Sequence, residues 1–218
     1  GRIVKVGIVQ LDLHHLDLVN FRDLVDLLGI DAPVHFTPKD ELNRQDYVFC
    51  KYMGEDECAA IIAGNHDMNT QYDDSDVGLH FPDIGIEDYF ELENSRNPVG
   101  IQTHIREVSS LMCIKLEDIP IVFAVHCVLH EYGHWLYFKE TGLTAYEFCQ
   151  QEKKERQPYE NITREIYNIP DWHPSKWYYA ERYDEEIYSK FSSEQEANKY
   201  ALDHIEDAMR TVFEKQNR

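Results

Sequence analysis

The sequence predicts an α+β fold in which a small mixed or antiparallel sheet packs on one long helix, with a second helix close to the C-terminus. Three observations lead to this prediction. An apolar run at 119–138 is long enough for a buried helix, and it carries His130-Glu131-Tyr132-Gly133-His134. Short segments rich in β-branched and aromatic residues come before this run. A segment at 192–212 follows it, with apolar residues at helical spacing.

Residues 1–95 are expected to form an α/β region that contributes the sheet. Its elements follow from the alternating or helical spacing of apolar residues and from turns that contain glycine. They are a strand at 2–9, a helix at 11–28 that stops at Gly29, two hairpin strands at 47–53 and 57–63 around Gly54-Glu55-Asp56, and a third strand at 77–81.

Residues 96–218 are expected to form the second part of one compact unit. A helix at 99–114 is expected to pack on the long apolar helix. Asp118 and Pro120 suit the first turn of that apolar helix, and Gly142 suits its C-terminal end. The apolar helix is therefore predicted to run through the whole motif at 130–134.

Within the apolar helix, His130 and His134 lie on one face, one turn apart. Two imidazoles so placed can bind the same Zn²⁺ ion, and a Glu beside the first can take a proton from a metal-bound water. Polar side chains in a buried helix are costly unless they are paired or bind a metal. We therefore expect a single Zn²⁺ ion held by His130 and His134, with Glu131 as the catalytic general base. His126 is too far for the same ion, because two turns span about 11 Å, and is expected to pack or to support the ligands.

A catalytic zinc site needs a third protein ligand, and the helix predicted at 192–212 offers two glutamates. At about 100° per residue, Glu194 falls inside the apolar stripe, whereas Glu196 falls on the opposite side and completes a capping box with Ser193. Glu194 is therefore predicted to face the apolar helix and to bind the metal. If the helix starts later, Glu194 lies at the surface instead. The stripe consists of Ala197, Ala201, Ile205, Ala208 and Val212.

The two motifs together resemble a known group. H-E-x-G-H at 130–134, followed by E-x-x-A-N-x-Y-A at 194–201, is similar to the ImmA/IrrE family of zincin-like metallopeptidases. The resemblance covers two short segments, about 126–142 and 192–212. It implies a zincin-like fold of the gluzincin type, with residues 96–218 as the catalytic region.

The resemblance also implies roles for individual residues. His130, His134 and Glu194 correspond to the family's zinc ligands, and Glu131 corresponds to its general base. Asn198 stands at the family's Asn/Asp position, which implies that it orients a ligand histidine. The link between the motifs is longer here than in most family members, and no helix-turn-helix segment accompanies them.

The segment 144–191 joins the two motifs and is expected to pass close to the metal. It holds half of the chain's 14 tyrosines and two of its three tryptophans. Such aromatics favour protein recognition, which makes the segment a candidate lid or substrate-binding insert, or they simply cover a long connection. It is also expected to supply a group that stabilises the oxyanion. The candidates are His173, Tyr178 and Tyr179.

The composition restricts the partners. The net charge of −20 excludes direct binding of nucleic acid phosphates as the main function. There is no run of apolar residues that could cross a membrane and no signal-peptide pattern at the N-terminus. The five cysteines are scattered and form no C-x-x-C motif, which is typical of a reducing compartment. We expect a cytoplasmic protein of bacterial or phage origin, with no membrane association.

These features predict a zinc metallopeptidase that hydrolyses a peptide bond in a protein or peptide substrate, which pairs with an edge strand of the sheet. Two alternatives stay open. The chain could be a catalytically silent, zinc-stabilised module that binds another protein, or a metal-free acidic inhibitor that mimics DNA towards a basic protein. Hydrolysis of a non-peptide amide would use the same chemistry.

Overall fold

The computed structural model describes residues 4–5, 8–9, 20–42 and 47–216. At the N-terminus, β1 (Val4–Lys5) and β2 (Ile8–Val9) pair in antiparallel fashion, so the single strand predicted at 2–9 is wrong for the part that is described. The helix predicted at 11–28 is confirmed for α1 (Phe21–Leu28), and residues 11–19 lie outside the described part. Gly29 ends α1 in the left-handed conformation, with φ 63°.

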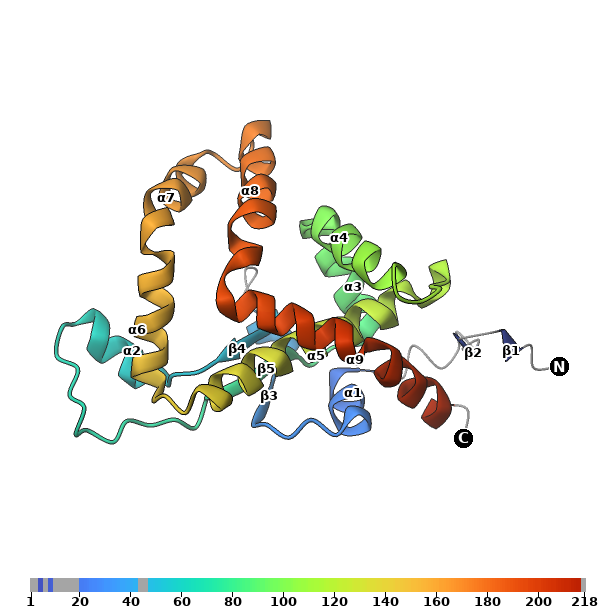
Figure 1. Cartoon of the computed structure of the whole chain (residues 1–218), viewed down its shortest axis with the longest axis horizontal. Helices are drawn as coiled ribbons and strands as arrows, with labels where there is room; N and C mark the ends of the chain where they lie inside the picture. The colour runs from blue at the N-terminus through green and yellow to red at the C-terminus, as the bar shows by residue number, and fades with distance from the viewer. Residues whose placement is uncertain (1–3, 6–7, 10–19, 43–46, 217–218) are drawn as a thin grey trace.

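A small mixed sheet lies behind the central helices (Figure 1). Its order is β3 (Val34–Thr37), β5 (Gly78–Pro82) and β4 (Phe49–Lys51), with β3 parallel and β4 antiparallel to β5. The strands predicted at 47–53 and 77–81 are confirmed by β4 and β5, and the α+β class with them. The strand β3 was not predicted.

The hairpin predicted around Gly54 is wrong. Residues Glu55–Ile62 form the helix α2 instead of a strand. Gly54 precedes its first turn, which carries three acidic residues that favour a helix N-terminus through the helix dipole. The two alanines that follow, Ala59 and Ala60, also favour helix over strand.

Two helices pack on one side of the molecule, α3 (Ile86–Arg96) and α4 (Pro98–Ser109). Both contact the long helix α5 (Ile119–Thr141). The helix predicted at 99–114 is confirmed by α4, although it stops at Ser109. Asn97 caps α4 by accepting a hydrogen bond from the Gly100 N–H. The helix α3 was not predicted.

The centre of the fold is the crossing of α5 (Ile119–Thr141) and α9 (Ser192–Gln216) (Figure 1). The ends predicted for α5 are confirmed, since Pro120 lies in its first turn and Gly142, with φ 67°, ends it. Gly133 lies buried at the crossing, where a Cβ atom would be 3.0 Å from the Ala197 Cα atom. The absence of a side chain at Gly133 therefore lets the two helices approach closely.

The burial of α9 agrees with its predicted faces. Its apolar stripe is buried, Glu194 is buried with it, and Glu196 is exposed. The predicted capping box is wrong, because α9 begins at Ser192 and Ser193 lies inside the helix. The Ser192 N–H instead donates to the Glu155 carboxylate at 2.7 Å. The helix therefore starts early enough to place Glu194 in its first turn.

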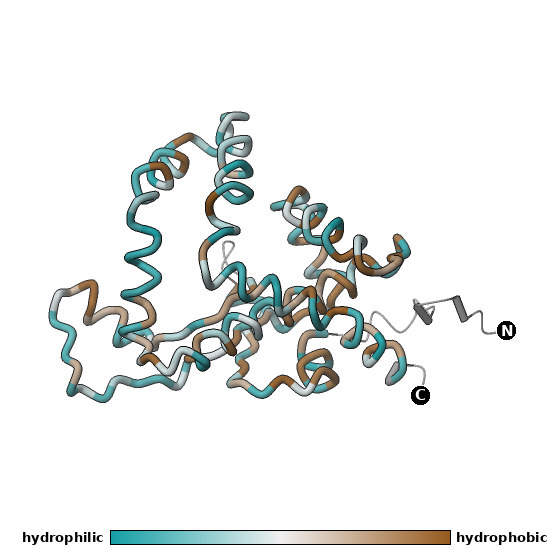
Figure 2. Tube along the Cα trace, in the orientation of Figure 1, coloured by the Kyte–Doolittle hydropathy of each residue, from teal (hydrophilic) through white to brown (hydrophobic). Residues whose placement is uncertain are grey.

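The segment 144–191 forms three helices that project from the core as an arm (Figure 1). They are α6 (Ala145–Arg156), α7 (Glu160–Asn168) and α8 (Pro174–Glu186), with prolines at or near the breaks between them. Figure 2 shows that α6 is largely hydrophilic, whereas hydrophobic residues gather around α1, α3 and α5. A single hydrophobic core takes residues from both predicted regions, for example Phe81 and Ile121. Within the described ranges, none of the helices combines the length and apolarity that crossing a bilayer requires.

Candidate metal centre

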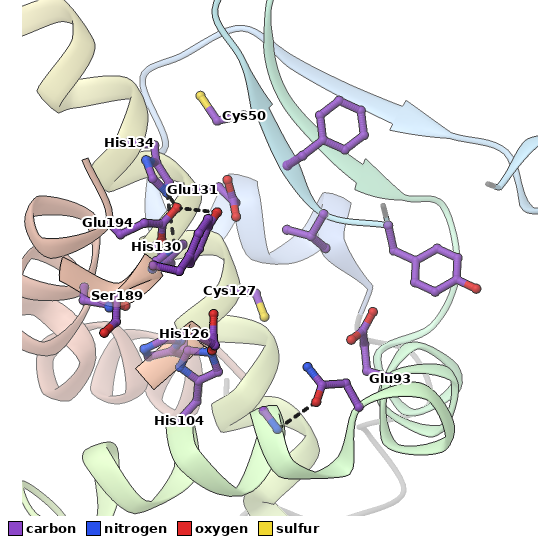
Figure 3. A pocket seen from close by; sticks show the side chains of 18 of the residues that line it. Cys50, Glu93, His104, His126, Cys127, His130, Glu131, His134, Ser189 and Glu194 are labelled. Atoms are coloured by element: carbon purple, nitrogen blue, oxygen red, sulfur yellow. Dashed lines mark hydrogen bonds and ion pairs between the residues drawn. The ribbon is translucent and has the colours of Figure 1, made fainter. Parts of the chain in front are cut away.

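Three side chains from the two crossing helices converge on one point. His130 and His134 come from successive turns of α5, and Glu194 comes from the first turn of α9. The His130 Nε2 atom lies 3.1 Å from Glu194 Oε2, and the His134 Nε2 atom lies 3.2 Å from Glu194 Oε1. The two Nε2 atoms are 3.2 Å apart. Figure 3 shows the three side chains turned towards one another.

These spacings fit a tetrahedral zinc site. Ligand atoms at 2.0–2.1 Å from a tetrahedral ion are about 3.3 Å from one another. The two Nε2 atoms are 3.2 Å apart, and each lies 3.1–3.2 Å from one oxygen of the Glu194 carboxylate, close to this value. The donor set of two imidazoles and one carboxylate is one that zinc uses when an open position is left. The predicted ligands are therefore brought together as a group that could hold a metal ion.

The ligand group is almost removed from water. Glu194 is 7% exposed and His134 is 6% exposed. Burial alone would raise the pKa of the Glu194 carboxyl, but hydrogen bonds to His130 and His134 outweigh it and hold that pKa well below its usual range. Glu194 is therefore a carboxylate at neutral pH, which is the form that binds a metal.

Glu131 lies beside the ligand group and lines the same cavity. Its side chain points away from Glu194, towards the strand that carries Cys50 (Figure 3). Burial raises the pKa of Glu131 to about 7; His130 opposes this shift and the charge of Glu194 adds to it. A carboxylate with a pKa near neutrality is a stronger base than an exposed one.

The tyrosine nearest to the metal ligands is one that the sequence analysis missed. Tyr188 lies in a short 3₁₀ turn, Tyr188–Lys190, between α8 and α9. Its hydroxyl donates a hydrogen bond to Glu194 Oε1 at 2.9 Å, and its ring lines the cavity. Its position six residues before Glu194 was the available signal, because a residue that directly precedes the ligand helix stays close to the ligand.

The candidates for oxyanion stabilisation lie elsewhere. His173, Tyr178 and Tyr179 are exposed in or next to α8, and none of them lines the cavity. The His173 ring accepts a hydrogen bond from the Ser175 N–H and so caps α8. These three side chains lie outside the cavity lining, whereas the turn Tyr188–Lys190 at the end of the arm contacts Glu194.

The cavity in front of the ligand group has a volume of about 450 Å³. One wall is the strand β4 with its flanking residues, and the others come from α3, α4, α5, α9 and the base of the arm. Asn198 lines the cavity, and its Oδ1 atom has no hydrogen-bond partner, so no contact with a ligand histidine is seen. Arg96 and Arg156 are the cationic side chains of the lining.

His126 does not join the ligand group at Glu194. It is 2% exposed and packs against His104 of α4, with ring centroids 4.7 Å apart. With Glu107 these two histidines form a second group that could hold a metal ion. Burial lowers the pKa of His126 well below its usual value and that of His104 to about 4, so both rings are uncharged at neutral pH.

Compared with known proteins, the chain matches no protein-family model, no curated protein and no solved structure.

Proposed function

We propose that the protein is a zinc-dependent hydrolase of the gluzincin type that cleaves a peptide bond in a protein substrate. One observation carries this proposal: His130, His134 and Glu194 converge at 3.1–3.2 Å in the wall of a cavity that Glu131 also lines. The resemblance of the two motifs to the ImmA/IrrE family supports the same function. We also propose the bacterial or phage origin and the cytoplasmic location that the sequence led us to expect.

The side chains divide the work of hydrolysis. His130, His134 and Glu194 would hold zinc, which acidifies a bound water and polarises a carbonyl group. Glu131 accepts a proton from the attacking water and returns it to the nitrogen of the leaving amine as the peptide bond breaks. Because the pKa of Glu131 is about 7 before the ion binds, the residue is suited to both accepting and donating a proton.

Tyr188 is the group that we assign to the developing negative charge on the carbonyl oxygen. Its hydroxyl donates to Glu194 and borders the cavity. A hydroxyl already fixed at this place can turn its hydrogen bond to an oxyanion with little rearrangement. Burial raises the pKa of Tyr188 well above its usual value, so the hydroxyl keeps its proton.

The strand β4 suits an extended peptide. In the described part of the chain, β4 pairs with β5 on one side only, and residues in and next to β4 line the cavity. An unpaired strand edge can bind a peptide by main-chain hydrogen bonds, independently of its sequence. Such binding would place the peptide backbone along the wall that faces the metal ligands.

Glu131→Gln tests the proposal, because the amide keeps the shape of the side chain and removes the base. We would incubate the zinc-loaded wild type and the variant with a library of synthetic decapeptides and identify new peptide ends by mass spectrometry. We expect cleavage by the wild type, a loss of at least about a hundredfold in the variant, and equal zinc content in both. Retained cleavage in Glu131→Gln would exclude Glu131 as the base.

A second candidate function is favoured by the arm. Trp172 is 80% exposed and Trp177 is 56% exposed, and exposed tryptophans of this kind are common in protein interfaces. A zinc-stabilised binding module would use this surface without turnover. It predicts no peptide cleavage by the wild type and a biological effect that Glu131→Gln leaves unchanged.

A further inference from the structure

We propose that His104, Glu107 and His126 form a second site for a divalent transition-metal ion, separate from the site at Glu194. His104 and Glu107 lie three residues apart on α4, which places them on the same face. His126 faces them from α5. One ligand atom of each residue lies within 4.8 Å of the other two.

Unsatisfied polar atoms point to a ligand between these side chains. The His126 Nε2 atom and the His104 Nδ1 atom are buried and have no hydrogen-bond partner. Burying such an atom lowers stability when nothing replaces its lost hydrogen bond with water. A metal ion bound to both lone pairs would remove this cost. Histidines that merely pack in a core bond their ring nitrogens to other polar groups instead.

Glu107 supplies the negative charge that such an ion needs. Its carboxyl is partly buried, and burial raises its pKa. Within residues 20–42 and 47–216, no lysine or arginine forms an ion pair with Glu107. A half-buried carboxylate without a cationic partner is costly, and a divalent ion would compensate it.

The second site is distinct from the first but lies next to it. His126 and His130 occupy successive turns of α5, and their ring centroids are 6.1 Å apart. His104 and His126 line the same cavity as His130 and Glu131 (Figure 3). The helix α5 thus contributes His126 to one site with α4, and His130 and His134 to the other site with α9.

The donor set indicates which ions fit. Two imidazoles and one carboxylate bind Zn²⁺, Fe²⁺, Co²⁺ or Ni²⁺ rather than Mg²⁺ or Ca²⁺. The three ligand atoms lie within 4.8 Å of one another, as those of His130, His134 and Glu194 do.

The proposal is tested by measuring how many metal ions each chain binds in variants of each site. Metal-free full-length protein would be dialysed against micromolar Co²⁺ in the presence of excess Mg²⁺, and bound cobalt would be measured by elemental analysis and by visible absorption. We expect about two ions in the wild type, and about one in Glu107→Gln, in His104→Gln and in Glu194→Ala. The double variant Glu107→Gln/Glu194→Ala should bind none.

His204→Gln and Glu206→Gln are matched controls, because both residues are exposed on α9, belong to neither group and do not line the cavity. Equal cobalt binding in Glu107→Gln, His104→Gln and these controls would overturn the proposal. So would a wild type that binds no ion beyond the one lost in Glu194→Ala. If Glu107→Gln loses no cobalt while Glu194→Ala loses one ion, the second site fails and the proposed hydrolase stands. If Glu194→Ala loses no cobalt while Glu107→Gln loses one ion, the second site stands and the proposed hydrolase fails.

Folding is checked on the same variants. Added Zn²⁺ should raise the melting temperature of Glu194→Ala, because an ion that binds only the folded chain stabilises it. The double variant Glu107→Gln/Glu194→Ala should show no such rise. An equal rise in both would mean that the stabilising ion binds elsewhere, and would count against the site.

Discussion

Gly133→Ala tests whether the close crossing of α5 and α9 sets the metal site. An alanine Cβ at this position would lie 3.0 Å from Ala197 Cα, 3.0 Å from Tyr200 Cβ and 3.1 Å from the Ala197 carbonyl oxygen. Carbon atoms in contact prefer about 3.5–4.0 Å. Two of the three neighbours are backbone atoms, which cannot rotate away, so the helices must move apart by a few tenths of an ångström.

Two opposing terms decide the effect of Gly133→Ala on stability. Alanine favours the middle of a helix by about 1 kcal/mol over glycine. Overpacking of a close contact costs about 1–3 kcal/mol. Because two of the three contacts are with backbone atoms and Gly133 is buried, we expect overpacking to win, with a net loss of about 1 kcal/mol. Urea unfolding of the metal-free protein measures this difference.

We expect Gly133→Ala to lower the affinity for zinc more than it lowers the free energy of unfolding. Glu194 lies one turn before Ala197, so a shift of α9 carries its carboxylate away from His130 and His134. We expect a loss of zinc affinity of about ten- to a hundredfold, the range seen when residues that orient ligands are changed. Competition with a coloured chelator measures it. A Gly133→Ala protein that is stabilised by about 1 kcal/mol and binds zinc normally would refute the argument.

Three further predictions concern Tyr188, His104 and the arm. Tyr188→Phe should keep zinc and lower kcat by about ten- to a thousandfold with little change in KM; an unchanged kcat would remove Tyr188 from the mechanism. The metal-free protein should lose about 2 kcal/mol of stability through His104 between about pH 7 and pH 5. The sign follows because burial lowers the pKa of His104 to about 4 from 6.5, so the unfolded chain takes up a proton that the folded chain refuses. His126 acts in the same direction, and urea unfolding of His104→Gln should show a smaller loss. Deleting 160–186 should leave zinc binding intact while impairing the recognition of a protein partner, which pull-down with the zinc-loaded chain would measure.

The helices that the sequence predicted correctly showed a clear pattern of apolar residues, and residues typical of helix ends marked where α5 begins and stops. The helix α5 had an apolar run, a proline in its first turn and a glycine at its end. In α9, the stripe from Ala197 to Val212 placed Glu194 inwards and Glu196 outwards, and the structure agrees. Because both ligand helices could be aligned by their faces, the metal group could be named before its geometry was known.

The errors arose where local patterns were ambiguous. The segment 57–63 is short and mostly apolar. Over so few residues, the spacing of apolar residues alone cannot separate a strand from a helix. Tyr188 was missed because its place depends on how the arm returns to the core. The pairing of His104 with His126 needed the rotation of α4, although His104 lies in one stripe with Ile101, Ile105 and Val108, a signal that was available.

The central claim is that Glu194 completes a metal site with His130 and His134. The most direct test is the metal content of wild type, Glu194→Ala and Glu196→Ala, loaded with zinc and measured side by side by elemental analysis. We predict that Glu194→Ala loses about one ion per chain relative to the wild type, whereas Glu196→Ala, changed two residues away on the exposed face, loses none. Equal zinc content in all three proteins would contradict the account.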